Sequence, residues 1–307
     1  MLNDCQQHGI AIILDTDPAF PELLSQIPDP PDMLFVLGTL EHSVGLAIAV
    51  VGTRHATKAG LQIAHAFAEG LAHAGLTIVS GLARCIDAAA HRGAINTGGT
   101  GGRTIAVLGS GLHNIYPHEH QHLVEGFICH GAAVSELPPT TPPQASAFPR
   151  QNRIVSGLSL GTVVIQAFQR SGALITATLA GEQGRGVFAL PGPVDCRMSA
   201  GCHSLIRDGA TLVTCIDEIF DELGPLHKKV RAPDGRDIHK PAELQLDEFE
   251  QSVLAAIDAT LDPTKKTTID AVVEYMNIQP SRILAACVEF EIRRIVIRLS
   301  GNIIERR

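Results

Sequence analysis

Four turns of this chain place glycine directly after an apolar run. Glycine lets a backbone approach a ligand closely, and a helix that begins after the turn offers free N–H groups to an anion. The turns are Gly52-Thr53-Arg54, Ser80-Gly81-Leu82, Gly109-Ser110-Gly111 and Pro191-Gly192-Pro193. Each also fits an ordinary strand–helix connection, so the prediction of a phosphate site rests on their number and on the one arginine. The residues predicted to contact phosphate are Gly52, Thr53, Arg54, Ser80, Gly81, Leu82, Gly109 and Gly111.

A short segment, residues 148–153, combines two arginines with an asparagine and an aromatic ring. It lies within residues 137–194, which hold four arginines and one acidic residue. Arginine suits bidentate contacts to phosphate, and a ring can stack on a nucleobase. The same pattern fits a helix N-terminus with solvated arginines and a core phenylalanine, and composition does not separate the two. The nucleic-acid contacts predicted in this segment are Phe148, Arg150, Asn152 and Arg153.

Patterns that would suggest catalysis fail in their context. Residues 157–161 match G-x-S-x-G, but a nucleophile elbow follows a strand and opens a helix, whereas here a helical pattern comes first. Residues 109–114 begin like a dinucleotide fingerprint but have Asn at its last glycine position. The chain has no G-x-x-x-x-G-K-[ST] segment, which excludes a P-loop NTPase. We expect no catalytic residue and no cofactor.

Histidine and cysteine spacing does not favour a metal centre. His118, His120 and His122 alternate, and on a helix only the first and the last share a face. A metal ion would need a further ligand from elsewhere, so we expect a polar helix surface and no metal. The seven cysteines form no CxxC pair, which favours reduced thiols. Asp87 and His91, spaced i, i+4, are predicted either to satisfy each other or to let Asp87 orient His91.

The elements that position these residues alternate between apolar runs and helical patterns, which predicts a doubly wound, mostly parallel α/β sheet. Ile63, Phe67 and Leu71 recur at i, i+4, i+8 and are predicted to mark the buried face of a helix over residues 57–75, with Thr57 as its cap. The predicted strands are residues 10–14, 33–38, 45–51, 76–80, 104–109, 132–135, 162–166 and 186–190.

The C-terminal part of the chain has a different pattern. Residues 225–245 are polar and interrupted by Pro and Gly, which predicts a linker. Helical patterns over residues 249–258, 267–276 and 280–294 precede a hairpin pattern at the end of the chain. We therefore predict a large α/β domain over residues 1–224 and a winged-helix-like domain over residues 246–307.

Composition bounds the class of protein. The 307 residues are 45% hydrophobic, which suffices for a large core, and there are no Trp and two Tyr, which argues against a broad base-stacking platform. No apolar run reaches the ~18 residues of a membrane span, so we expect a soluble cytoplasmic protein without a membrane partner. The net charge of −8 argues against bulk nucleic-acid binding. However, ten of the 11 basic residues in 1–224 are Arg, which leaves room for a local phosphate-binding face.

Taken in order, these segments resemble the DNA-processing protein A family, also called Smf. The resemblance runs from about residue 14 to residue 215 and covers roughly two-thirds of the chain. The matching segments are 51–54 with Gly60, 80–84, 86–87, 90–94, 104–112 with Tyr116-Pro117, Ser135-Glu136, Phe148-Pro149, 152–154, 171–177, Pro191-Gly192, 201–203, 205–206 and 209–210.

The resemblance implies an extended Rossmann-like domain that binds single-stranded DNA, without the full sterile-alpha-motif-like domain that many members carry at the N-terminus. It also implies a homodimer that loads a RecA-type recombinase onto incoming DNA in natural transformation, without catalytic turnover. Arg54 matches a phosphate-contact position of the family. Four residues depart from the family pattern: Cys85 replaces Gly, His113 replaces Asp, Gln151 replaces Arg and Gln166 replaces Glu.

Two other functions remain as alternatives. A nucleoside-monophosphate-binding enzyme of the lysine-decarboxylase-like N-glycosidase group would carry a Pro-Gly-Gly-x-Gly-Thr run, which residues 191–194 interrupt. A winged-helix regulator of duplex DNA would need a basic recognition helix, but residues 280–294 hold Arg282 and no further basic residue before Arg293. This module, with a net charge of −2, favours a docking or structural unit.

Overall fold

The computed structural model describes residues 2–40, 46–97, 102–223, 248–262, 266–276, 278–292, 295–299 and 302–306. The chain divides into two compact units, Met1–Gly224 and Pro225–Arg307. The predicted linker, residues 225–245, lies outside the described residues. Over the described ranges, no helix has the length and apolar character that crossing a membrane requires.

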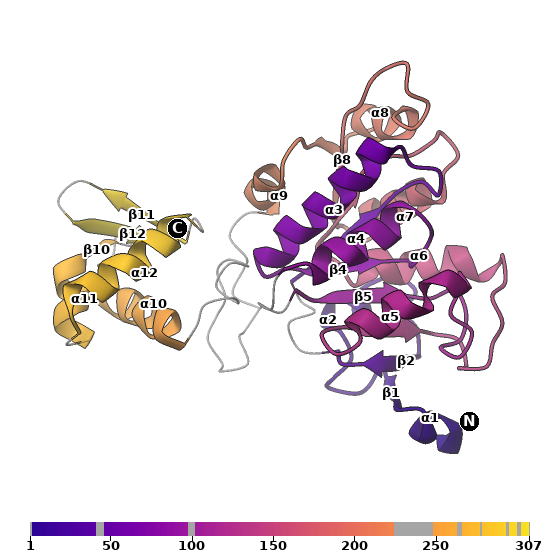
Figure 1. Ribbon diagram of the computed structural model, residues 1–307, viewed down its shortest axis with the longest axis horizontal. Helices are drawn as coiled ribbons and strands as arrows, with labels where there is room; N and C mark the ends of the chain where they lie inside the picture. The colour runs from indigo at the N-terminus through magenta and orange to yellow at the C-terminus, as the bar shows by residue number, and fades with distance from the viewer. Residues whose placement is uncertain are drawn as a thin grey trace. The chain divides into compact units, whose positions relative to one another are not determined.

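The first unit contains a nine-stranded sheet and its covering helices (Figure 1). The strands are β1 Ile10–Leu14, β2 Met33–Gly38, β3 Ala47–Val51, β4 Thr77–Ser80, β5 Thr104–Val107, β6 Ala132–Ser135, β7 Gly161–Val164, β8 Gly186–Ala189 and β9 Thr211–Leu212. The helices are α1 Leu2–Gln7, α2 Glu22–Ser25, α3 Lys58–His73, α4 Ile86–Ile95, the 3₁₀ turn η2 His118–His120, α5 Gln121–Phe127, α6 Ala147–Gly157, α7 Gly172–Glu182, α8 Ala200–Arg207 and α9 Ile216–Leu223.

The strand order is β1-β2-β6-β5-β4-β3-β7-β8-β9. Strands β3 to β9 pair in parallel, whereas β2 pairs antiparallel with both β1 and β6. The chain moves outward from β3 through β4, β5 and β6, and then returns to β7 on the other side of β3. The sheet is therefore doubly wound, as predicted, and the direction of winding reverses between β3 and β7.

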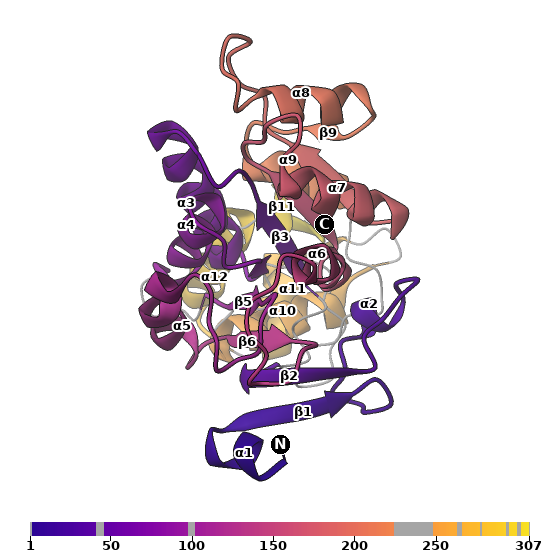
Figure 2. The same cartoon turned by 90° about the vertical axis from the view of Figure 1, so that its right-hand side faces the viewer.

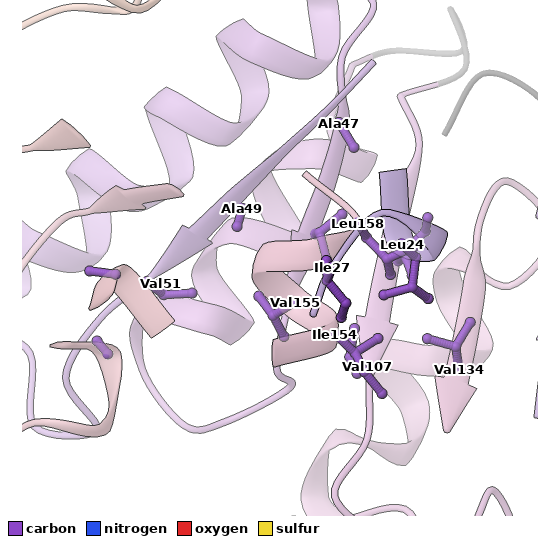
Figure 3. Packing of buried hydrophobic residues seen from close by; sticks show 14 of the residues in the cluster. Leu24, Ile27, Ala47, Ala49, Val51, Val107, Val134, Ile154, Val155 and Leu158 are labelled. Carbon is purple, nitrogen blue, oxygen red and sulfur yellow. The ribbon is translucent and has the colours of Figure 1, made fainter. Parts of the chain in front are cut away.

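Helices cover both faces of this sheet. In Figure 2, α3, α4 and α5 lie on one side, and α2, α6 and α7 lie on the other. Every residue of β3 to β7 is consequently buried, as the uninterrupted apolar runs predicted. Helix α6 contributes Ile154 and Val155 to the core, and its C-cap residue contributes Leu158. They belong to the same cluster as Leu24 and Ile27 (Figure 3). This packing fixes the helix whose first turn reaches the candidate site.

Helix α3 confirms the predicted cap and two of the three residues predicted to be buried. Thr57 caps the helix as predicted, because its Oγ1 accepts a hydrogen bond of 3.0 Å from the N–H of Gly60. Phe67 and Leu71 are buried, but Ile63 is 38% exposed, so the predicted face was wrong at that residue. Eight residues of an α-helix turn through about 800°, which places Ile63 some 80° away from Leu71 around the helix axis.

The second unit has its own core. It contains α10 Glu248–Thr260, β10 Lys266–Thr268, α11 Ile269–Met276, α12 Pro280–Ile292, β11 Val296–Leu299 and β12 Ile303–Arg306. The strands form an antiparallel sheet in the order β10-β12-β11. The helices and the hairpin agree with the fold class predicted for this module. The helix predicted over residues 267–276 begins only at Ile269, because Thr267 and Thr268 belong to β10, which pairs with β12.

Candidate nucleic-acid interface

A cavity of about 530 Å³ lies at the carboxyl edge of the first unit's sheet. The turns after β3, β4 and β7 and the first turns of α6 and α7 form its walls. Because β3 and β7 are neighbours at which the winding reverses, this is the topological switch point, where doubly wound sheets bind their ligands. We call this space the edge cavity.

The edge cavity brings together half of the residues predicted to contact phosphate or nucleic acid. The turn after β3 contributes three of them, the turn after β4 one, and α6 two. The predicted residues that line the cavity are Gly52, Thr53, Arg54, Gly81, Phe148 and Asn152.

The guanidinium of Arg54 is the main cationic group of this wall. It lies 5.0 Å from the centroid of the Phe148 ring, within range of a cation–π interaction. The Tyr116 and Phe148 ring centroids are 6.3 Å apart, so two aromatic rings lie next to each other in the cavity lining. Within the described part of the chain, neither Arg54 nor Arg170, which also lines the cavity, forms an ion pair. Both positive charges are therefore available to an anionic ligand.

A further part of the cavity lining is the N-terminus of α7. Ser171, Gly172 and Ala173 line the edge cavity, and the Ser171 hydroxyl accepts a hydrogen bond of 3.4 Å from the N–H of Ala173. The first N–H groups of an α-helix have no intrahelical partner, and the helix dipole adds a partial positive charge there. Together with Arg54 and Arg170, this end of α7 gives the cavity the character of an anion site.

Asp87 is a buried carboxyl group in the same cavity. It accepts a hydrogen bond of 3.1 Å from the N–H of Ala83. Burial raises its pKa from 3.8 to about 6, while the backbone N–H groups of Ala83, Gly81 and Gly52 and the charge of Arg54 act to lower it. The glycine N–H groups that the sequence assigned to phosphate therefore already face a carboxylate. The arginines and the N-terminus of α7 are the remaining groups of the cavity lining that suit an anion.

The predicted pairing of Asp87 with His91 does not occur. The His91 ring is fully buried, stacks on Phe127 with centroids 5.2 Å apart, and its Nδ1 lies 2.7 Å from Oγ1 of Thr104. Burial lowers the His91 pKa to about 3, so this ring is neutral and belongs to the core. The expected polar surface at His118–His122 also needs a correction, since His120 is buried and its Nδ1 bonds the carbonyl of Leu82 at 2.9 Å.

Four predicted contacts in the glycine turns are structural instead. Ser80 is buried and donates to the carbonyl of Val50 at 2.7 Å, and Leu82 is buried with φ of +62°. A Cβ on Gly109 would meet the Phe148 ring, and one on Gly111 would meet backbone carbonyls of residues 138 and 139. These turns use glycine for close packing of the chain against itself, which sequence alone does not distinguish from close approach to a ligand.

Arg150 and Arg153 were also assigned to nucleic acid, and the structure places both in ion pairs. Arg153 is 8% exposed; its Nε lies 2.8 Å from Asp29 and its Nη2 lies 2.7 Å from Glu136. Arg150 lies on the surface, where its Nε pairs with Glu136 at 3.0 Å. Arg153 therefore holds α6 to neighbouring segments and is not available to a ligand.

Several lining residues were missed by sequence reasoning. Gln151 is buried, and its Nε2 donates to the carbonyls of Gly81 and Val107, both at 2.7 Å, which ties α6 to the turns after β4 and β5. Arg170 and Ser171 follow β7, and only the strand order places that turn beside β3. The signal for them was the acid-poor composition around residue 170, which does not specify a position in space.

A doubly wound sheet with an arginine-bearing cavity at its switch point defines a Rossmann-like fold. Two solved structures share this fold. DNA processing protein A from Streptococcus pneumoniae aligns with TM-score 0.66 and 38% identity, covering 72% of this chain and 78% of that protein. DNA processing protein A from Helicobacter pylori, known for its single-stranded DNA binding mode, aligns with TM-score 0.62 and 27% identity, over 70% of this chain and 95% of that protein.

The family model of DNA recombination-mediator protein A matches residues 11–224, and this chain belongs to that family. Protein Smf of Escherichia coli K12 is 47% identical over 205 residues, 66% of this chain and 54% of the relative. DNA processing protein DprA of Bacillus subtilis 168 is 41% identical over 219 residues, 71% of this chain and 73% of the relative. The chain thus spans about half the length of its E. coli relative. The resemblance seen in the sequence is confirmed.

Proposed function

We propose that this chain binds single-stranded DNA in the edge cavity and acts as a recombination mediator. The observation that carries the proposal is the Arg54 guanidinium, which has no ion pair among the described residues and lies over the Phe148 ring at the switch point of the sheet. Membership of the recombination-mediator family supports it, as does the single-stranded DNA binding of the H. pylori relative.

The two walls of the cavity suit the two parts of a nucleotide. In this proposal, a backbone phosphate binds between Arg54, Arg170 and the N-terminus of α7, which supply positive charge and free N–H groups. We propose that an unstacked base stacks on the exposed side of the Phe148 and Tyr116 rings. In a duplex the bases are paired and stacked inside the helix, so this arrangement favours a single strand.

Fluorescence anisotropy tests the DNA-binding proposal. We expect a labelled oligo-dT to bind more tightly than a duplex of the same length, with an affinity that falls as salt rises. Arg54→Ala should weaken oligo-dT binding by about 10- to 100-fold and reduce the salt slope, since one charge-assisted phosphate contact contributes about 1.5–3 kcal/mol. Arg92→Ala, which removes an exposed arginine outside the cavity lining, is the matched control.

Equal affinities of Arg54→Ala and Arg92→Ala for oligo-dT would contradict the assignment of the site. A folded protein that binds neither single strand nor duplex would contradict the DNA-binding proposal itself. Titration with nucleoside monophosphates would then test the alternative of an N-glycosidase-like enzyme.

We further propose that the protein works as a homodimer that loads a RecA-type recombinase onto incoming single-stranded DNA in natural transformation, without catalytic turnover. Family membership supports this role. Sedimentation of the full chain tests the dimer. The loading step is tested by recombinase filament formation on oligo-dT that is covered by a single-strand-binding protein. We expect this chain to accelerate filament formation and Arg54→Ala to fail to do so.

A further inference from the structure

A second group of polar side chains lies away from the edge cavity. Asp4 belongs to α1, His8 follows that helix, and His113 lies in the turn after β5. One carboxylate oxygen and one nitrogen from each imidazole ring all lie within 4.8 Å of one another. His113 Nε2 is 3.0 Å from Asp4 Oδ2, and His8 Nδ1 is 3.5 Å from Asp4 Oδ1. His113 lies more than 100 positions from Asp4 and His8 in the chain, and the fold brings the three side chains together.

The donor set is the one that zinc-type ions prefer. Two imidazole nitrogens and one carboxylate oxygen suit Zn²⁺, Co²⁺ or Ni²⁺, whereas Mg²⁺ and Ca²⁺ favour oxygen ligands alone. In the metal-free protein, the Nε2–H of His113 donates to the Asp4 carboxylate, and Nδ1–H of His8 donates to the Asp4 carbonyl at 2.9 Å. A cation can take the place of these two hydrogen bonds when each neutral ring moves its proton to its other nitrogen, which leaves His8 Nδ1 and His113 Nε2 free to bind the ion.

We propose that Asp4, His8 and His113 bind one divalent transition-metal ion of the zinc type through one carboxylate oxygen and two imidazole nitrogens. The sequence predicted no metal, because the three ligands are not close in the chain and the conspicuous histidines were residues 118–122.

The surroundings of the cluster support a site with an open coordination position. His8 and His113 also line a cavity of about 300 Å³, whose wall includes the apolar side chains of Ile10, Leu37 and Leu112. Three protein ligands leave the fourth tetrahedral position to water or to a small molecule in that cavity. A bound ion would also join α1 to the turn that leads to Tyr116, a residue of the edge cavity.

Metal titration of the full chain tests the proposal. We expect one equivalent of Zn²⁺ to bind, measured by competition with a chromophoric chelator. Co²⁺ should give ligand-field absorption bands without the intense near-ultraviolet band of a cobalt–thiolate bond. His8→Ala and His113→Ala should each lower the Zn²⁺ affinity by at least about tenfold. His122→Ala is the matched control, because its side chain is 93% exposed and lies outside the cluster.

Circular dichroism distinguishes a loss of Zn²⁺ binding from a loss of folding in these variants. The His8 side chain is 54% exposed, so His8→Ala should keep the wild-type circular dichroism spectrum. Loss of Zn²⁺ affinity in His8→Ala and His113→Ala, with none in His122→Ala, supports the site. Unchanged affinity in both variants, a cobalt–thiolate band, or no stoichiometric binding by the wild type would each overturn it.

Discussion

The turn from β3 into α3 and the first turns of α6 both place arginine at one edge of the sheet. Arg54 in the former has its guanidinium 5.0 Å from the Phe148 ring centroid and no ion pair among the described residues. Arg153 in the latter is buried and lies within 2.8 Å of both Asp29 and Glu136. An arginine without an ion pair offers its charge to a ligand more readily than one held by two carboxylates, and the two regions differ in this respect.

The largest expected effect is the loss of folding stability caused by Arg153→Ala in α6. Arg153→Ala would leave the buried Glu136 carboxylate with only the exposed Arg150 as partner, and removing one member of a buried pair costs about 3 kcal/mol of stability. Urea unfolding followed by circular dichroism measures the loss. We expect the folded variant to bind oligo-dT within about twofold of the wild type.

Arg92→Ala controls for the loss of a surface arginine and should change stability by less than about 0.5 kcal/mol. The distinction between a structural Arg153 and a ligand-binding Arg54 fails if Arg153→Ala keeps full stability and loses DNA binding.

The aromatic ring of the cavity gives the next effect. Phe148→Leu keeps an apolar side chain but removes the surface on which a base can stack, and base–aromatic stacking contributes about 1–3 kcal/mol. We expect oligo-dT affinity to fall by about tenfold with little change in its salt slope, because no phosphate contact is lost. Phe148→Tyr, which retains the ring, is the matched control. A clearly reduced salt slope in Phe148→Leu would mean that a phosphate contact is lost, and would show that Phe148 acts by orienting Arg54.

The acidic residue near Arg54 is Asp87, and its titration can be measured separately from the ion pairs of Arg153. Its folded-state pKa of about 6 lies above the ordinary value of 3.8, so the folded protein favours the neutral carboxyl. Its contribution to stability is therefore fully present below pH 3.8 and is lost as pH rises through about 6. Between pH 5 and pH 8 we expect the wild type to lose about 1 kcal/mol relative to Asp87→Asn.

Unfolding curves of both proteins across this range measure the difference, and groups common to both cancel. Oligo-dT binding should weaken over the same pH interval in the wild type, because the ionised carboxylate repels phosphate. An identical pH dependence in Asp87→Asn would contradict the raised pKa.

The smallest effect concerns the turn after β4. Cys85 precedes α4 with φ of +69°, a backbone conformation that favours glycine, which is the residue usual in the family at this position. Cys85→Gly should therefore raise stability by about 0.5–1 kcal/mol without changing oligo-dT affinity. Cys85→Ala removes the Sγ contact with the Arg54 carbonyl but keeps the unfavourable φ, so it should not be stabilised. Equal stabilisation of both variants would assign the effect to the thiol.

Much of the fold could be predicted because its information is local. The runs over residues 47–51, 77–80 and 132–135 are mostly apolar and buried at every position, the pattern typical of strands covered on both faces. Short elements escaped prediction: β9 has two residues, and β10 has three. Such lengths hold at most one and a half periods of the two-residue strand pattern, too few to be recognised.

The site was predicted less completely than the fold. Arg54 was placed correctly at the edge of the sheet, because a turn after a buried strand leads there whatever the strand order. The ion pairs of Arg153 could not be predicted because its partners, Asp29 and Glu136, lie 124 and 17 residues away in the chain. Glycine was equally ambiguous: Gly81 lines the cavity, whereas Gly111 packs against residues 138 and 139.

By itself, the sequence determined the alternation of strands and helices, the division into two modules and the family, because apolar periodicity and motif order are written along the chain. Only the tertiary structure decided which charges are free. Compensation of Arg153, burial of Asp87 and convergence of Asp4, His8 and His113 depend on distances between segments remote in the chain. Electrostatic interaction and desolvation follow those distances and the burial they create, neither of which can be read from residue spacing.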